Sequence, residues 1–258
     1  MTTRLQDRFF TPHPGRFLLA ATVALAPVSA PAWAQPAPPR EERVTFAKGA
    51  SVATISGQLK GDADVDYLVR AAAGQTLSVE LKVTNRQNYF NVLPPGSDGV
   101  AMYAAQTGEP YTGILPADGD YKVRVYLMRS AARRNEASTY TLTIRVTGAA
   151  LPALPASQDA LVPGTPFHAS ASIKCVAPFG DPPPKPCEAF VIRRGIDGTA
   201  TVEIAYAGGR RRLLFVKGKP VASDASDKMT FTRQGEVTTV RFESGEFYEI
   251  PDPLVIGG

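Results

Sequence analysis

Strict alternation of apolar and polar side chains runs through the first half of the chain and limits the folds that it can adopt. Leucine and valine alternate with polar residues over residues 77–83, and the same period of two recurs at 121–127 and 140–146. This period places one face of an extended strand in a core and the other face in water. No stretch there has a sustained helical apolar stripe, and a parallel sheet would need crossover helices. We therefore expect an antiparallel β-sandwich over residues 42–148.

The second half of the chain shows strand patterns in shorter segments. Residues 149–166 are rich in alanine, leucine and proline and have no clear period, which is typical of a linker. Beyond them, turn sequences such as Asp197-Gly198 and Gln234-Gly235 separate short strands and predict a second, small antiparallel β domain over residues 167–258. The strands expected in it are 169–176, 189–193, 199–207, 211–216, 229–232, 237–243 and 247–250. The whole chain is thus expected to be all-β.

Residues 1–34 have the parts of a secretory signal. Three arginines precede a short apolar run at 17–30, and Ala32-Trp33-Ala34 supplies a small-x-small cleavage site. The run is short for a bilayer span and contains a proline, and no cysteine follows the cleavage site to take a lipid anchor. We expect a periplasmic protein without a membrane span, which starts near Gln35 with a proline-rich segment at 35–41.

Composition argues against several classes of function. The leader takes away three arginines and one aspartate, so the formal net charge falls from +4 to only +2 in the exported chain. Nucleic acid is therefore not an expected partner. His168 is the single histidine outside the leader, which excludes metal sites built on several histidines. We expect His168 at the surface, no cofactor, no metal site and no catalytic residue.

The two cysteines, Cys175 and Cys187, lie in the part of the chain that we expect to be exported. An even number of cysteines in an oxidising compartment favours a disulfide, which would close a proline-rich loop and stabilise a small core. A free thiol is the alternative that the sequence leaves open.

Asp62, Asp64 and Asp66 alternate in the sequence and raise the question of a calcium site, because hard cations take several carboxylates. No downstream acid at loop spacing completes such a site, and aspartate is a common turn residue. We favour a turn, and the sequence leaves cation binding by these residues open. The basic run Arg210-Arg211-Arg212 is expected to lie on the surface of a hairpin.

The connection between two expected strands at residues 127–136 is longer than a hairpin needs and is strongly basic. It carries Arg129, Arg133 and Arg134 together with one acid, Glu136. The plain interpretation is a solvated loop. The alternative is an anchor for a carboxylate-lined partner, because a loop held on rigid strands projects its guanidinium groups and arginine binds carboxylates bidentately.

Four segments of the first half resemble the periplasmic inhibitors of goose-type (g-type) lysozyme over about residues 43–147. These segments are Asp66 to Ala71, Ala73 to Val79, Tyr89 to Ser97 and Tyr126 to Asn135. The first two segments are also similar to the bacterial pre-peptidase C-terminal domain. The last two segments therefore distinguish the lysozyme inhibitors from that domain. The resemblance implies a non-enzymatic β-sandwich that inserts loops into the cleft of a muramidase, with g-type lysozyme as its partner.

The resemblance also implies roles for particular residues. Arg129 and Arg133 are the implied contacts with the acidic catalytic groups of the enzyme, and Arg134 is adjacent and an alternative. Tyr67 is implied as a weaker, supporting contact. Residues 149–258 are not accounted for, although Ser244 to Tyr248 fits a short Ser-Gly-x-x-Tyr pattern of other bacterial lysozyme inhibitors. A β-turn leading into a strand explains this pattern more simply.

Two other functions remain as alternatives on sequence grounds. The same sandwich could be a cell-envelope module that binds cell-wall glycan, which an aromatic platform on a sheet face would favour. A hydrolase would need a pair of carboxylates that the sequence does not place. The oligomeric state and the role of the C-terminal region cannot be inferred from the sequence.

Overall fold

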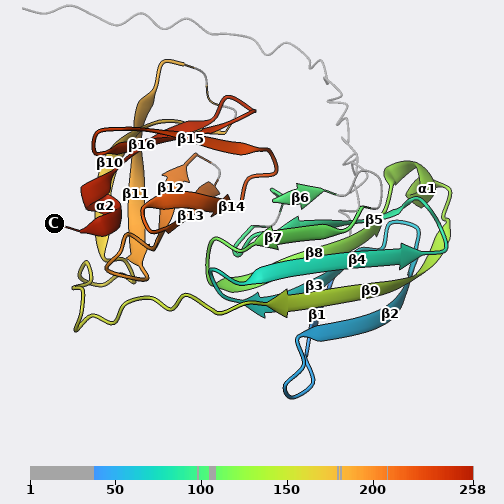
Figure 1. The fold of residues 1–258 in the computed structure, drawn as a ribbon. Coiled ribbons are helices and arrows are strands. Elements are labelled where there is room, and N and C mark those ends of the chain that lie inside the picture. The colour runs from blue at the N-terminus through green and yellow to red at the C-terminus, as the bar shows by residue number, and fades with distance from the viewer. Residues whose placement is uncertain are drawn as a thin grey trace, which may run out of the picture. The chain divides into compact units, whose positions relative to one another are not determined.

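The computed structural model describes residues 38–97, 99–104, 109–178, 180, 182–207 and 209–257. Contacts group residues 36–258 into one compact unit, and its described part is built almost entirely of strands (Figure 1). The all-β prediction is therefore confirmed. The expected signal peptide lies outside the described residues. Within them, no helix has the length and apolar character that a membrane crossing requires.

Two sheets packed face to face form the first half. The first sheet has the strand order β1-β3-β8-β5-β6 and the second has the order β2-β9-β4-β7. Among the described strands, only β1 and β3 pair in parallel. The strands are β1 (Arg40–Arg43), β2 (Val52–Lys60), β3 (Val65–Ala71), β4 (Thr76–Val83), β5 (Asn88–Leu93), β6 (Tyr103–Ala104), β7 (Tyr111–Ile114), β8 (Gly119–Leu127) and β9 (Ala137–Thr147).

The core between these sheets follows the alternation that the sequence predicts. Tyr121, Val123 and Val125 of β8 point inward from the first sheet, and Leu142 and Ile144 of β9 meet them from the second. The intervening side chains of β8 and β9 are more exposed. Hydrophobic burial on one face of each strand thus explains why this part of the sequence forms a sandwich.

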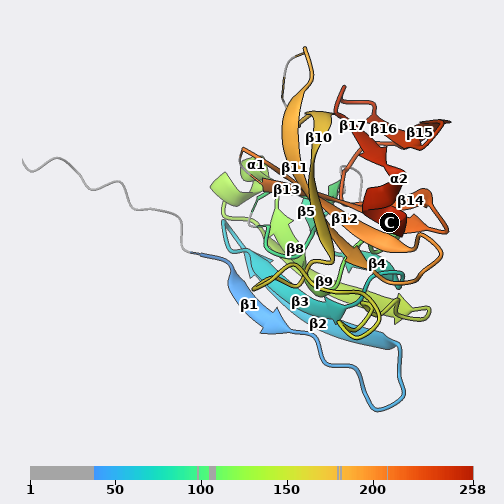
Figure 2. The ribbon, with the colours of Figure 1, turned by 90° about the vertical axis from the view of Figure 1, so that its left-hand side faces the viewer.

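The second half is an eight-stranded sheet with the order β14-β13-β12-β11-β10-β17-β16-β15 (Figure 2). Every pairing in it is antiparallel. A short helix, α2 (Asp252–Ile256), buries Leu254 and Val255 in its core. The strands are β10 (Ala169–Val176), β11 (Lys185–Arg193), β12 (Ala200–Tyr206), β13 (Gly209–Val216), β14 (Lys219–Ser223), β15 (Met229–Gln234), β16 (Val237–Phe242) and β17 (Phe247–Pro251).

The largest differences from the strands expected in this half are one strand that begins earlier than predicted and one strand that was missed. β11 begins at Lys185 and not at residue 189, and β14 was not predicted. Both segments contain a proline, Pro186 and Pro220, and proline argues against a strand in a sequence because it cannot donate to the ladder. β14 tolerates Pro220 because it lies at the edge of the sheet.

A disulfide joins Cys175 of β10 to Cys187 of β11, as the sequence predicts. The two Cα atoms are 5.9 Å apart, which is an ordinary separation for a disulfide. His168 differs from the expectation of a surface residue, because it is only 7% exposed. Its Nδ1 accepts a hydrogen bond from the backbone N–H of Arg193 at 3.0 Å, and its Nε2 lies 3.0 Å from the carbonyl oxygen of Leu154.

Buried polar contacts join the eight-stranded sheet to the connection before β8 and to the segment that follows β9. The guanidinium of Arg194 donates to Asp118 Oδ2 at 3.0 Å and to the carbonyl oxygen of Leu151. Thr201 Oγ1 donates to the carbonyl oxygen of Pro116 at 2.7 Å. Residues 149–166 form no strand, and the domain boundaries at 148 and 167 stay a prediction.

A charged cluster is buried in the eight-stranded sheet. Arg211 donates to both carboxylate oxygens of Glu246, at 2.6 and 2.9 Å, and to Asp224 at 3.1 Å. Tyr248, which is fully buried, donates its hydroxyl to Glu246 at 2.6 Å. The expectation that Arg211 decorates a hairpin is therefore wrong, whereas Arg210 is exposed. The Ser-Gly-x-x-Tyr pattern is a turn that leads into β17 and buries its tyrosine.

Candidate functional site

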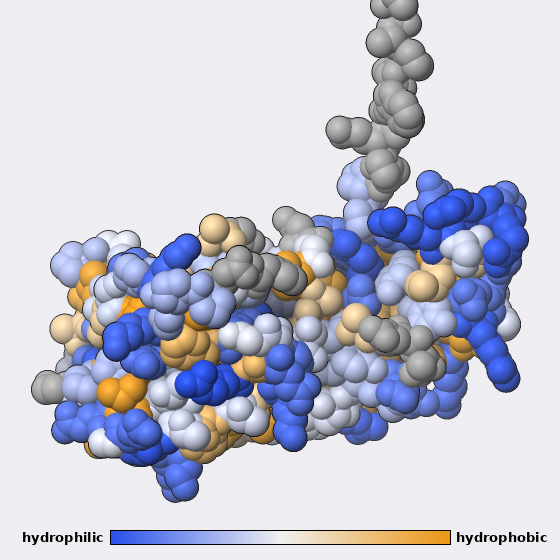
Figure 3. All heavy atoms as spheres, turned by 90° about the horizontal axis from the view of Figure 1, so that it is seen from above, coloured by the Kyte–Doolittle hydropathy of each residue, from blue (hydrophilic) through white to orange (hydrophobic). Residues whose placement is uncertain are grey.

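The basic connection between β8 and β9 contains one helical turn, α1 (Arg129–Arg133), and is not simply the loop that was expected. A five-residue turn is too short to show a helical period in a sequence. Figure 1 places α1 at one end of the sandwich, and Figure 3 shows strongly hydrophilic side chains gathered at that end. The structure therefore presents the arginines on a short, regular element.

Arg129 and Arg133 are four residues apart in α1, so they lie on the same side of the helical turn. Both are exposed. Within the described part of the chain, neither has a hydrogen-bond or ion-pair partner. Two guanidinium groups are thus free to bind an anionic group together.

Arg134 differs from these two arginines because it is already paired. Its Nε donates to Glu136 Oε1 at 2.7 Å, and the other oxygen of Glu136 accepts from Asn85 at 2.8 Å. Hydrogen bonds from Asn85 and Arg134 hold the pKa of Glu136 below its ordinary value. Glu136, the one acid of this connection, is therefore paired with Arg134 and does not pair with Arg129 or Arg133.

Three contacts hold α1 in place. Ala131 is fully buried in the sandwich core. The backbone N–H of Met128 donates to the carbonyl oxygen of Gln87 at 2.8 Å, and that of Gly61 donates to the carbonyl oxygen of Glu136 at 2.9 Å. The turns before β3 and β5 thus fix both ends of the connection, and little ordering of the backbone would be needed when the arginines bind.

Overpacking the buried face of α1 is expected to destabilise the protein. Ala131→Leu would force a larger side chain into a filled core, and we expect it to lower the free energy of unfolding by about 1 to 3 kcal/mol. Ser130→Leu on the exposed side is the control, with an expected change within about 0.5 kcal/mol. Urea unfolding of both variants checks this, and equal stability of the two would show that α1 is not anchored through Ala131.

Tyr67 differs from the arginines because its side chain is buried and theirs are exposed. It is only 1% exposed, and its hydroxyl lies 2.7 Å from that of Tyr140 on the opposite sheet. Burial is the main cause that raises the pKa of Tyr67. The structure therefore places Tyr67 inside the sandwich, where it can support the surface but does not form part of it.

The three alternating aspartates have different surroundings. Both carboxylate oxygens of Asp66 accept from Arg124, at 2.7 and 2.8 Å. Asp62 and Asp64 face a recess beside α1. Among the described residues, no three acidic, histidine or cysteine side chains are grouped as a metal site would need.

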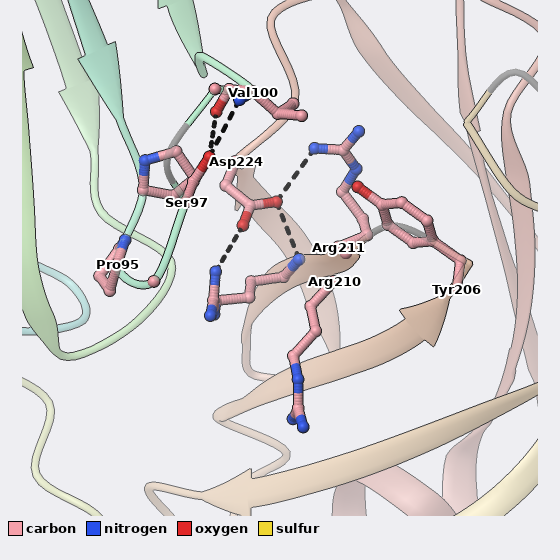
Figure 4. Close-up of a pocket in the computed structure, with 12 residues that line it drawn as sticks. Pro95, Ser97, Val100, Tyr206, Arg210, Arg211 and Asp224 are labelled. Carbon is pink, nitrogen blue, oxygen red and sulfur yellow. Dashed lines mark hydrogen bonds and ion pairs between the residues drawn. The ribbon is translucent and has the colours of Figure 1, made fainter. Parts of the chain in front are cut away.

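The segment Tyr89 to Ser97 does not join the arginines. Phe90 and Val92 point into the core, and the turn after β5 borders a different cavity of about 570 Å³ (Figure 4). The other wall of that cavity is built from the charged cluster of the eight-stranded sheet, where Asp224 accepts from Arg211 and Arg212. The segment thus contributes to the sandwich core and to this second cavity.

The fold and the arginine pair define an all-β protein with a basic surface at one end of a sandwich. A curated relative from Escherichia coli K12, described as an inhibitor of g-type lysozyme, is 31% identical over 106 residues, which cover 40% of this chain and 78% of the relative. PliG of Aeromonas hydrophila, a solved periplasmic inhibitor of g-type lysozyme, is 33% identical, with 42% of this chain and 96% of that chain covered and a TM-score of 0.40. PliG of Salmonella Typhimurium is 31% identical, with coverages of 42% and 98% and a TM-score of 0.34. No protein-family model matches the chain.

The chain belongs to the family of periplasmic inhibitors of g-type lysozyme. The family resemblance read from the sequence is thereby confirmed. The solved relatives are described as periplasmic. The family members are inhibitors, in agreement with the expectation of a non-enzymatic protein. The match covers the N-terminal part of the chain, so the eight-stranded sheet lies outside it.

Proposed function

We propose that this protein inhibits g-type lysozyme and does so by placing Arg129 and Arg133 of α1 in the cleft of the enzyme. The observation that carries the proposal is the pair of exposed, uncompensated guanidinium groups on one anchored helical turn. Family membership supports the choice of enzyme.

The chemistry of a glycosidase cleft supports the same choice. Such a cleft must hold a carboxylic acid and, as a rule, a second carboxylate beside the bond that is cleaved. Arginine stays charged and forms bidentate, charge-assisted hydrogen bonds with carboxylates. Because closure of the interface removes water, these hydrogen bonds become stronger than they would be on an open surface. Arg129 and Arg133 are therefore proposed as the contacts with the acidic groups of the enzyme.

Arg134 and Tyr67 take supporting roles in this proposal. Arg134 would have to give up its ion pair with Glu136 before it could bind the enzyme. Tyr67 supports α1 only through the core that it shares with Ala131.

Lysis of a peptidoglycan suspension tests the proposed function. The purified protein should protect the suspension from g-type lysozyme and leave lysis by c-type lysozyme unchanged. Protection should weaken as salt is raised, because charged contacts contribute to association. Absence of protection at micromolar protein, or equal protection against both enzymes, would contradict the proposal.

A further inference from the structure

A recess of about 630 Å³ opens beside α1. Its apolar walls include Leu127 and Met128, and the Met128 side chain is exposed although it is hydrophobic. The residues that line it are Asp62, Asp64, Tyr126, Leu127, Met128, Arg129, Ser130, Ala132 and Arg133. The two arginines therefore share one recess with two carboxylates, and neither arginine forms an ion pair within the described chain.

Asp64 is the one of these two carboxylates that is partly buried. Its backbone carbonyl oxygen accepts from the N–H of Arg40 at 3.0 Å. Its carboxylate has no hydrogen-bond or ion-pair partner within the described chain, neither from Arg129 nor from Arg133. Burial raises the pKa of Asp64, and the nearby Arg124 opposes this shift. A carboxylate that has lost part of its water without gaining a donor is an open acceptor.

The recess carries charges of both signs, so it is complementary to a partner surface that also carries both acidic and basic groups. The arginines suit carboxylates, whereas Asp64 repels carboxylates and suits a cation. An isolated carboxylate beside a binding surface weakens binding unless the partner supplies a donor, so such a group also selects among partners.

We propose that the α1 recess receives a lysine or arginine side chain of the enzyme, with Asp64 as the acceptor, while Arg129 and Arg133 bind the enzyme's carboxylates. This inference rests on the proposed function and adds a determinant of specificity to it. An enzyme with an apolar or acidic side chain at this point would leave Asp64 unpaired and would be bound more weakly.

The inhibition constant of Asp64→Asn against g-type lysozyme tests the inference. The variant keeps the shape and removes the charge, and we expect it to weaken inhibition about tenfold or more, mainly through faster dissociation. Glu80→Gln is the matched control, because Glu80 lies on the exposed side of β4 beside Lys82 and its replacement changes the net charge equally. We expect that control to change the constant less than about threefold. Arg129→Ala is measured beside them.

The outcomes separate the two claims. Weakening by Arg129→Ala together with unchanged or tighter inhibition by Asp64→Asn would overturn the inference and leave the proposed function intact. Unchanged inhibition by Arg129→Ala and Arg133→Ala would overturn the proposed contact of these arginines with the enzyme and, with it, the inference, whereas absence of inhibition by the unmodified protein would overturn the proposed function. The thermal midpoint of each variant shows whether it is folded. If Asp64→Asn does not fold, Asp64→Ser is measured in its place.

Discussion

Replacing Arg129 or Arg133 with alanine is expected to weaken inhibition of g-type lysozyme by about 30-fold or more. A charge that is paired and desolvated in an interface contributes about 2 kcal/mol or more on truncation, and 2 kcal/mol corresponds to about 30-fold. The thermal midpoint should not change, because both side chains are exposed and have no partner in the described chain. Inhibition constants and thermal unfolding of the same preparations check both parts.

Arg134→Ala and Arg133→Lys are informative controls. Arg134 is paired with Glu136, so its loss should weaken inhibition less than about threefold. Arg133→Lys keeps the charge and loses the bidentate geometry, so an intermediate constant is expected. An effect of Arg134→Ala as large as that of Arg133→Ala would contradict the assignment of the contact to the unpaired arginines.

Arg211→Met is expected to produce the largest loss of stability, about 3 kcal/mol or more. The substitution removes the cation that faces two buried carboxylates, those of Glu246 and Asp224. Asp224 is almost completely buried, and burial raises its pKa in spite of the opposing charge of Arg211. Without that arginine, the remaining contacts from Arg212 and Tyr248 compensate the two acids only in part.

Denaturant unfolding measures this loss, and the neighbouring Arg210→Met is the matched control. Arg210 has one exposed ion pair with Glu203 and lies over the ring of Phe190. We expect the control to lower the free energy of unfolding by less than about 1 kcal/mol. Equal losses from both substitutions would show that the buried cluster is not what stabilises the eight-stranded sheet.

Much of the fold could be predicted because period-two alternation records which face of a strand is buried. The strands around Tyr121 to Leu127 and Tyr140 to Val146 follow directly from it. The same signal could have placed Arg211, which shares a face with Leu213 and Phe215 of β13. A run of three arginines is typical of a solvent-exposed segment. In a strand, however, the period of two decides which side chain is buried, and it places Arg211 on the inner face.

The site could be predicted in part only. The sequence indicates a basic connection, and the family resemblance singles out Arg129 and Arg133. It does not show that Glu136 pairs with Arg134, because that choice depends on how Asn85 from a distant turn positions the carboxylate. It also does not show that Asp64 shares a recess with α1, since that proximity is created by the packing of two connections that are distant in sequence.

Competition with a soluble peptidoglycan fragment tests most directly whether α1 occupies the cleft of g-type lysozyme. The apparent dissociation constant of the protein for the enzyme is measured at rising concentrations of the fragment. Occupation of the cleft predicts that the constant rises in proportion to the fragment concentration once that exceeds the fragment's own dissociation constant. A constant that stays unchanged while the fragment saturates the enzyme would contradict it and would place the bound surface outside the cleft.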